Sequence, residues 1–310
     1  SAGASLGALA AAALVAALAL GLRALPAFAP GAALSRCPDA VAALAASGGR
    51  VVTPPMDTLW AWALGDGRFD APLLSRQREA LLGYTNLTCG VATVRTAAPL
   101  PTAAAASMSR AIGSGDDARP AGAAGGRALW TPFPPERLPS RRVGGFFRAP
   151  LAPYLPRLSW VRAYAIEPDP DRAWTRIASG ETDLTRTVVL DRRPDPDPGA
   201  GTGPPMLLAR VATDRPEEVV AEVTSNDRGL LVLADLFYPG WTAEENGRTL
   251  PIYRANGYFR AVALPAGTHR VVFRYRPVSV YAGLGLTALA LVVFVALAYA
   301  GEPVLRRRTA

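Results

Sequence analysis

A run without a charged side chain, residues 278–300, constrains this chain more than any other feature of its sequence. Its 23 residues are rich in leucine, valine and alanine, and a helix needs about 20 apolar residues to cross the hydrocarbon core of a bilayer. A second charge-free run, residues 4–22, is dominated by alanine and is less hydrophobic. We expect a transmembrane helix in both runs, with a secretory signal peptide as the alternative for the first, since residues 27–29 resemble a cleavage site. Both interpretations place the residues that follow across the membrane.

The arginines beside the second run predict its orientation. Arg306, Arg307 and Arg308 lie shortly after it, and short basic flanks of a span stay in the cytoplasm. Arg274 and Arg276 on the other side oppose this, but long domains are translocated largely regardless of charge. We therefore expect a multi-pass protein of the cell membrane, with residues 23–277 extracytoplasmic and residues 301–310 as a cytoplasmic tail.

The basic residues of the chain are all arginine, and they exclude several functions. The absence of lysine among the 33 basic residues removes a P-loop lysine and a Schiff-base lysine. The arginines are scattered among 25 acidic residues, whereas nucleic-acid binding requires basic clusters interleaved with aromatic residues. We therefore expect a solvated surface and no nucleic-acid partner.

Two cysteines are present, Cys37 and Cys89. In an exported domain they would form one disulfide, and the alternative is a pair of buried thiols. Neither cysteine belongs to a Cys-x-x-Cys pair or to a Cys/His cluster, so we expect no metal site, and no motif indicates a cofactor.

Proline and glycine divide the middle of the chain. Residues 194–205 combine both with aspartate, which opposes helix and strand, and we interpret them as a linker. Residues 23–193 mix strand-like runs with helix patterns at residues 71–83, 102–113 and 169–180, which predicts an α+β domain. Residues 206–277 contain short alternating runs separated by Asn-Gly and Pro-Gly turns, which predicts an antiparallel β-sandwich.

The sandwich contains the candidate ligand contacts. Tyr238 and Trp241 surround a Pro-Gly turn, where aromatic rings can stack on sugars or lie at lipid headgroups, although a core role for Trp241 is the favoured alternative. Arg254 and Arg260 flank another turn and could hold a phosphate or carboxylate, the alternative being an ion pair with Asp235 or Glu244. The full set of candidates is Asp235, Tyr238, Trp241, Arg254, Asn256 and Arg260.

No catalytic residue is predicted. His269 is the only histidine, so a Ser-His-Asp triad would have to use it. It lies in an alternating strand-like run, where a packing or surface role is favoured. A stand-alone hydrolase is therefore disfavoured.

The segment that begins "DLFYPGW" and continues through "NGRTLPIYRANGYFRAVALPAGTHRVVFRYRP" into an apolar run resembles the C-terminal end of the YfhO family of bacterial membrane proteins, which are related to GT-C glycosyltransferases. Upstream, "YLPRLSWVRAYAIEPDPDRAWTRIASG" is similar to a family segment in which a Pro-Arg pair leads to a strand, "PDP" and a short helix.

The resemblance implies transfer of a sugar from a polyprenyl-phosphate donor to an envelope polymer or lipid outside the membrane. It places the catalytic acid in an upstream membrane domain of the same protein, so this chain would be an accessory or substrate-contacting part that also meets the lipid bilayer. The alternative is a membrane-anchored carbohydrate-binding or adhesion module of the cell envelope.

Overall fold

A computed structural model describes residues 37–64, 77, 79–81, 89–95, 103–113, 117–200 and 203–306. The chain divides into two compact units: unit 1 comprises residues up to 101, 112–122 and 126–154, and unit 2 comprises residues 102–111, 123–125 and 155–310. Within these residues the structure is mostly β-sheet, with several antiparallel pairings and few helices. The predicted span at residues 4–22 and most of the predicted helix at residues 71–83 lie outside the described residues.

Unit 1 is built on a mixed five-stranded sheet of order β2-β1-β3-β5-β4. Strands β1 and β2 run parallel, as do β1 and β3, whereas β3, β5 and β4 pair antiparallel. Trp130 and Phe146 stack at a centroid distance of 5.1 Å inside its apolar core. The elements are α3 (Asp39–Ala46), β1 (Arg50–Val52), α4 (Met56–Leu64), β2 (Ala92–Thr93), α8 (Ala118–Ala123), β3 (Gly126–Thr131), β4 (Arg141–Val143) and β5 (Phe146–Pro150).

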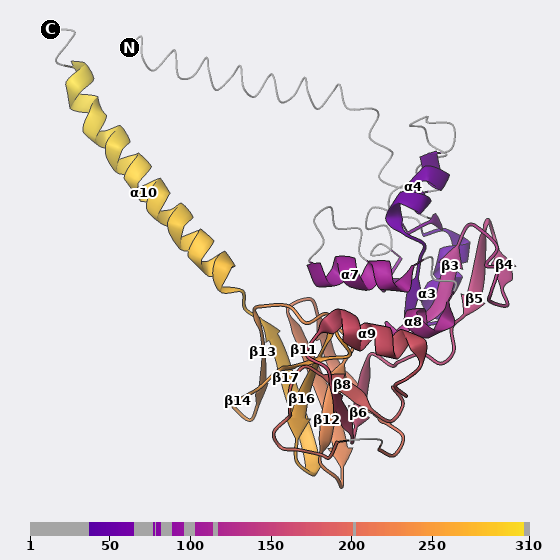
Figure 1. Cartoon of the computed structure of the whole chain (residues 1–310). Helices are drawn as coiled ribbons and strands as arrows, with labels where there is room; N and C mark the ends of the chain where they lie inside the picture. The colour runs from indigo at the N-terminus through magenta and orange to yellow at the C-terminus, as the bar shows by residue number, and fades with distance from the viewer. Residues whose placement is uncertain are drawn as a thin grey trace. The chain divides into compact units, whose positions relative to one another are not determined.

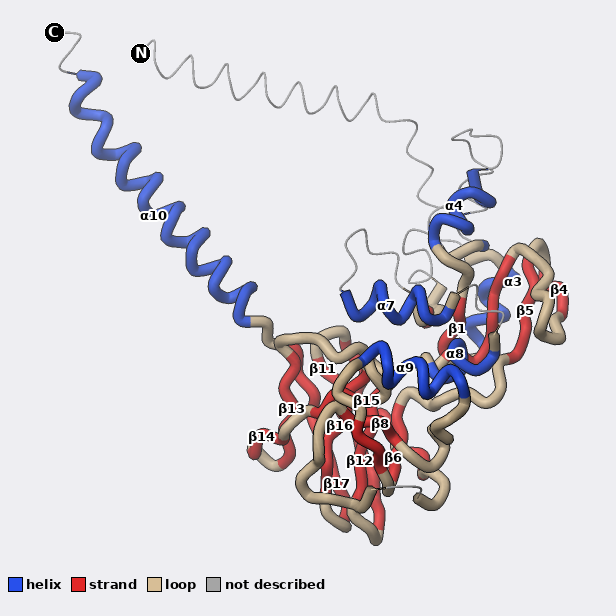
Figure 2. The backbone as a smooth tube through the Cα atoms, viewed as in Figure 1, coloured by secondary structure: helices blue, strands red, loops and turns tan. Residues whose placement is uncertain are grey.

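Unit 2 contains the predicted β-sandwich. A five-stranded sheet of order β10-β11-β17-β13-β14 and a seven-stranded sheet of order β7-β8-β15-β16-β12-β6-β9 contribute side chains to one apolar core. Figures 1 and 2 show most of these strands together, among them β6, β12 and β16 of one sheet and β11, β13 and β17 of the other. The strands are β6 (Leu158–Val161), β7 (Tyr164–Ile166), β8 (Val188–Leu190), β9 (Leu207–Leu208), β10 (Arg210–Arg215), β11 (Glu218–Ser225), β12 (Gly229–Leu233), β13 (Trp241–Glu245), β14 (Arg248–Leu250), β15 (Tyr253–Ala255), β16 (Phe259–Leu264) and β17 (Gly267–Tyr275).

Two predicted helices are present in unit 2, α7 (Ala103–Ile112) and α9 (Pro170–Ser179). Asp169 caps the start of α9 by accepting hydrogen bonds from two backbone N–H groups, and Gly180 ends the helix in the left-handed conformation. Trp174 on its buried face packs edge-on to Phe259 of the seven-stranded sheet, at 6.4 Å between ring centroids. The start and stop signals in the sequence therefore define this helix.

The stretch at residues 194–205 does not separate two domains, contrary to the prediction. Strands before it, such as β6 and β8, and strands after it, such as β12 and β16, belong to one sheet, and the unit boundary lies near residue 154 instead. The loop is attached to that sheet, because the Asp195 N–H donates to the Tyr253 hydroxyl at 3.0 Å. Proline and glycine exclude a regular ladder here, but they do not exclude a fixed loop within one fold.

The two Asn-Gly turns are present as predicted. Asn246 and Gly247, between β13 and β14, both have positive φ values, and so do Asn256 and Gly257, between β15 and β16. This conformation matches the right-handed twist of the flanking strands. Strands β9 and β10 follow each other closely in the sequence but belong to different sheets.

Strand β17 leads almost directly into the last helix. Only Arg276 and Pro277 separate Tyr275 from α10 (Val278–Arg306), the long C-terminal helix in Figure 1. Its described apolar side chains, among them Leu284, Leu286 and Phe294, are exposed. No helix within the described residues has both the length and the hydropathy that a membrane span requires.

Candidate functional site

Four of the six predicted contacts gather at one pocket of the sandwich. Alternation along β16 directs Val262 and Leu264 into the core between the sheets, and Arg260 points the same way at the start of the strand. There it borders an open pocket of about 610 Å³. We call this the Trp241 pocket; its lining includes Arg157, Asp214, Asp235, Tyr238, Trp241 and Arg260.

Arg260 lies at the inner wall of this pocket and is only 2% exposed. Its Nη2 atom lies 3.4 Å from Oδ2 of Asp235, and its guanidinium carbon lies 3.8 Å from the centroid of the Trp241 ring. A buried charge is costly unless it is compensated, and here a carboxylate and an aromatic face compensate it. The pair of Arg260 and Asp235 confirms one of the two alternatives that the sequence left open.

Asp235 is shared between two arginines. Nε and Nη2 of Arg157 donate to its two carboxylate oxygens at 3.1 and 3.0 Å, a bidentate pair, and Nη1 of Arg157 also contacts Asp214. Burial lowers the pKa of Arg157, but the hydrogen bonds that its guanidinium donates to Asp235 and Asp214, together with the negative charge of these carboxylates, outweigh burial and raise this pKa overall. The result is a charged network that joins β6, β10, β12 and β16.

The outer rim of the pocket is aromatic. The Tyr275 ring lies 5.3 Å from the Trp241 ring and 5.9 Å from the Tyr238 ring, between centroids. Tyr238 is 40% exposed, so its ring can meet a ligand. Trp241 has both a structural and an exposed side, because it packs against the sandwich core and also lines the pocket.

The same rim is attached to the start of α10. The Arg276 N–H donates to the Gly240 carbonyl at 2.7 Å. Gly240 has φ +102°, and a Cβ added there would lie 3.0 Å from the Cα of Pro277. Glycine is therefore required for the loop at residues 238–240 to approach the residue that precedes α10.

Arg254 and Asn256 do not line the Trp241 pocket. The buried Asn256 exchanges two hydrogen bonds with Val189 of β8, its N–H donating at 2.6 Å and its Oδ1 accepting at 3.0 Å. The Arg254 carbonyl accepts a hydrogen bond from the Asp191 N–H, and the Arg254 N–H donates to Oδ1 of Asp191. The Arg254 guanidinium contacts the Pro168 carbonyl. Asn256 therefore connects the end of β15 to β8, and Arg254 connects β15 to Asp191, which follows β8, and to the segment before α9.

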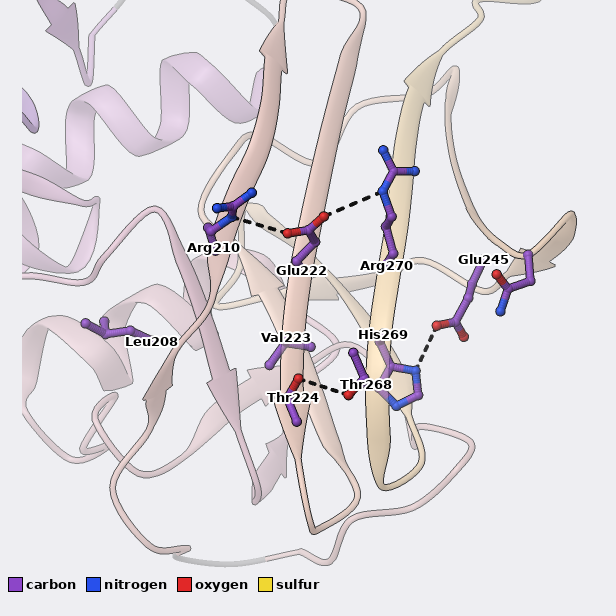
Figure 3. A pocket seen from close by; sticks show the side chains of 10 residues that line it. Leu208, Arg210, Glu222, Val223, Thr224, Glu245, Thr268, His269 and Arg270 are labelled. Carbon is purple, nitrogen blue, oxygen red and sulfur yellow. Dashed lines mark hydrogen bonds and ion pairs between the residues drawn. The ribbon is translucent and has the colours of Figure 1, made fainter.

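His269 is buried at the other end of β17, beside a second pocket of about 490 Å³ (Figure 3). Its Nδ1 lies 2.8 Å from Oε1 of Glu245 and its Nε2 lies 2.9 Å from the Pro265 carbonyl oxygen. A carbonyl only accepts, so Nε2 carries a proton. With both ring nitrogens engaged in this way, the favoured packing role fits better than nucleophilic catalysis.

Sequence reasoning missed Arg157 and Asp214 as parts of the pocket. Arg157 follows Pro156, and this Pro-Arg pair, already part of the segment that resembles the family, is the signal that marks it. Asp214 lies near the end of β10. No signal in the sequence distinguishes it from the other acidic residues.

Cys37 and Cys89 form a disulfide, with 5.4 Å between their Cα atoms. The structure therefore selects one of the two interpretations of the cysteines. In the part of the chain that the structure describes, no group of three or more His, Cys, Asp and Glu side chains could hold a metal ion.

Comparisons with known proteins agree with the family resemblance. Residues 209–287 match the family described as "Bacterial membrane protein YfhO", which confirms the resemblance over the strands from β10 to β17 and the start of α10. No curated protein is similar enough to this chain to count as a match.

Among solved structures, the chain is similar to the arabinofuranosyltransferase AftD from Mycobacteria, determined by cryo-electron microscopy, with 22% identity and a TM-score of 0.22. Two structures of a mutant of that enzyme match with 26% identity and a TM-score of 0.22. The match covers 24% of this chain and 6% of the AftD chain, so the chain spans only a small fraction of that enzyme.

Proposed function

Because residues 209–287 match the YfhO family of bacterial membrane proteins, we propose that this chain is an extracytoplasmic part of a GT-C-like glycosyltransferase of the cell envelope. Its β-sandwich contacts substrate during transfer of a sugar from a polyprenyl-phosphate donor to an envelope acceptor. An upstream membrane domain of the same protein supplies the catalytic acid, and the sandwich supplies none.

The observation that carries the proposal is the position of the Trp241 pocket beside the start of α10. The loop at residues 238–240 is hydrogen-bonded to Arg276, two residues before the helix begins. If α10 is the predicted span, the pocket opens at the membrane surface. A lipid-linked substrate confined to that plane then meets a site confined to the same plane, which raises its effective concentration.

The chemistry of the pocket suits a hydroxyl-rich ligand. The exposed Tyr238 ring offers an apolar face on which a sugar can stack. Asp214, with its side chain 58% exposed, offers a carboxylate that accepts hydrogen bonds from hydroxyl groups. Arg157 and Arg260 hold the floor of the pocket in place, so these two exposed side chains are presented from a rigid base.

The disulfide supports the proposed compartment. Disulfides form and persist mainly in oxidising surroundings, such as the bacterial periplasm and the cell surface. The bond between Cys37 and Cys89 is therefore expected in an extracytoplasmic domain. The proposed cytoplasmic side of residues 301–310 rests on the arginines that follow α10.

The experiment compares sugar transfer in membranes that carry either wild-type protein or Tyr238→Ala. Transfer is followed from a lipid-linked radiolabelled donor, at limiting donor concentration, in a host whose own copy of the gene is deleted. We expect Tyr238→Ala to lower transfer about five-fold or more, since stacking on one aromatic ring contributes about 1 kcal/mol. Tyr154→Ala is the matched control: Tyr154 is 43% exposed but lies in unit 1, and transfer should be unchanged.

Unchanged transfer by Tyr238→Ala would contradict a substrate role for the pocket. If the purified chain then bound an envelope polymer through the same pocket, the alternative of a carbohydrate-binding or adhesion module would replace the proposal, because that alternative needs no transfer activity.

A further inference from the structure

The hairpin formed by β4 and β5 in unit 1 carries an unbalanced positive charge. Residues 137–150 contain four arginines and no acidic residue. In unit 2, by contrast, arginines such as Arg157 and Arg274 each contact two carboxylates. The arginines of the hairpin therefore differ from these two in having no acidic residue within the same stretch of chain.

The register of this hairpin places two arginines face to face. Arg141 of β4 pairs directly with Arg148 of β5, and like charges opposite each other destabilise an antiparallel pair. No ion pair between either arginine and a carboxylate is found among the described residues. The Nε atom of Arg148 is buried and has no hydrogen-bond partner. An anion between the two guanidinium groups would offset their mutual repulsion and would accept a hydrogen bond from Nε of Arg148.

A pocket of about 300 Å³ lies at this place, lined by Pro139, Ser140, Arg141, Arg148 and Pro150. Its polar side chains are two guanidinium groups, which only donate hydrogen bonds, and one hydroxyl. None of the lining residues is acidic. The lining therefore favours an oxyanion over a cation or an apolar ligand.

The geometry points to a binding site for phosphate, either free or as a monoester, held between Arg141 and Arg148. A guanidinium binds two oxygens of an anion through parallel N–H groups. A carboxylate has only one pair of oxygens for such a contact, whereas a tetrahedral phosphate can present a pair of oxygens to each of two arginines. A phosphate monoester carries a charge of about −1.5 to −2 near neutral pH, which balances the two guanidinium charges.

The site is independent of the proposed glycosyltransferase role, because it lies within unit 1, and it is tested without any transfer assay. The test uses the whole chain in an uncharged detergent and measures binding of inorganic phosphate by calorimetry at low salt. Arg141→Gln and Arg148→Gln should each weaken phosphate binding about ten-fold or more, the loss expected for one bidentate charged contact.

Arg142→Gln is the matched control, since it removes the same charge from the neighbouring position. Arg142 pairs with Phe147 on the opposite face of the hairpin, and its Nε donates to the Gly144 carbonyl. Binding should change less than about three-fold, the screened effect of a charge that does not touch the anion. An equal loss in all three variants would show attraction by net charge alone and would overturn the site.

Folding is checked by thermal unfolding without phosphate. Removing one of two opposed charges should leave the thermal midpoint unchanged or raise it. If Arg148→Gln fails to fold, the variant at the exposed Arg141 still tests the site.

A second experiment replaces inorganic phosphate with dihexanoyl phosphatidic acid. Tighter binding than that of inorganic phosphate indicates a lipid headgroup, and weaker binding indicates free phosphate. Failure of the wild-type chain to bind either probe at about 20 mM, far above ordinary affinities, overturns the proposal.

Discussion

Asp235 is the residue on which the Trp241 pocket depends most. Its carboxylate lies between Arg157 and Arg260, and Arg260 is almost fully buried. Asp235→Asn should lower the free energy of unfolding by about 3 kcal/mol, because it leaves a buried guanidinium without a countercharge. Urea unfolding followed by circular dichroism measures the change.

Asp227→Asn provides the comparison for that variant. Asp227 also pairs with an arginine, Arg162, at 2.6 Å, but its side chain is 59% exposed. Exposed ion pairs contribute about 0–1 kcal/mol, so this variant should unfold almost like the wild type. Equal losses in the two variants would contradict the importance assigned to burial.

Asp169 makes unfolding sensitive to acid. Backbone N–H groups of Arg172 and Asp171 donate to its side chain and lower its pKa below the usual 3.8. A carboxylate with a lowered folded-state pKa stabilises the fold above its unfolded pKa, and this stabilisation disappears as the pH falls through the folded-state value. Thermal midpoints of wild type and Asp169→Ala should therefore differ at pH 6 and converge as the pH falls through the folded-state pKa of Asp169.

The elements of this chain differ in how far the sequence determines them. Helix α9 was predictable because local signals specify its ends: Asp169 and Gly180 act through hydrogen bonds, and Pro170 acts through its fixed φ. The turns at Asn246 and Asn256 were predictable for the same reason, since positive φ favours asparagine followed by glycine.

The contacts that build the pocket were only partly predictable. The pair of Arg260 and Asp235 was one of two alternatives, whereas Arg157 is 78 residues from Asp235 in sequence. They meet because β6 pairs with β12, and such long-range pairing leaves no local pattern. The prediction that residues 194–205 link two domains was wrong for the same reason. Composition excludes a β-strand there, but it does not reveal that the strands before and after this stretch pair in one sheet.

The disulfide is the strongest cross-link within unit 1. It closes a loop between residues separated by 52 positions, and a loop of that size stabilises the folded state by about 4 kcal/mol in the chain-entropy description. Cys37→Ala should lower the thermal midpoint of unit 1 and abolish the mobility shift between reduced and oxidised samples on a gel. An unaltered midpoint under oxidising conditions would contradict a structural role for the bond.

At the scale of the whole molecule, the central prediction concerns sidedness. Arg137 is exposed in the loop before β4, so trypsin added to spheroplasts should cleave there if the body of the protein faces outward. A tag after residue 310 should resist degradation until the cells are lysed. Cleavage of the body only after lysis would reverse the proposed orientation.

The junction between β17 and α10 has a mechanical consequence. Strand β17 lies in the middle of its sheet, bonded to β11 on one side and β13 on the other, and only Arg276 and Pro277 separate it from the helix. A tensile load applied through the helix reaches this central strand with no slack to absorb it. The hydrogen bonds to β11 and β13 on both sides of β17 are then loaded together. We therefore expect the sheet to resist the pull as a whole, whereas an edge strand would separate one hydrogen bond at a time.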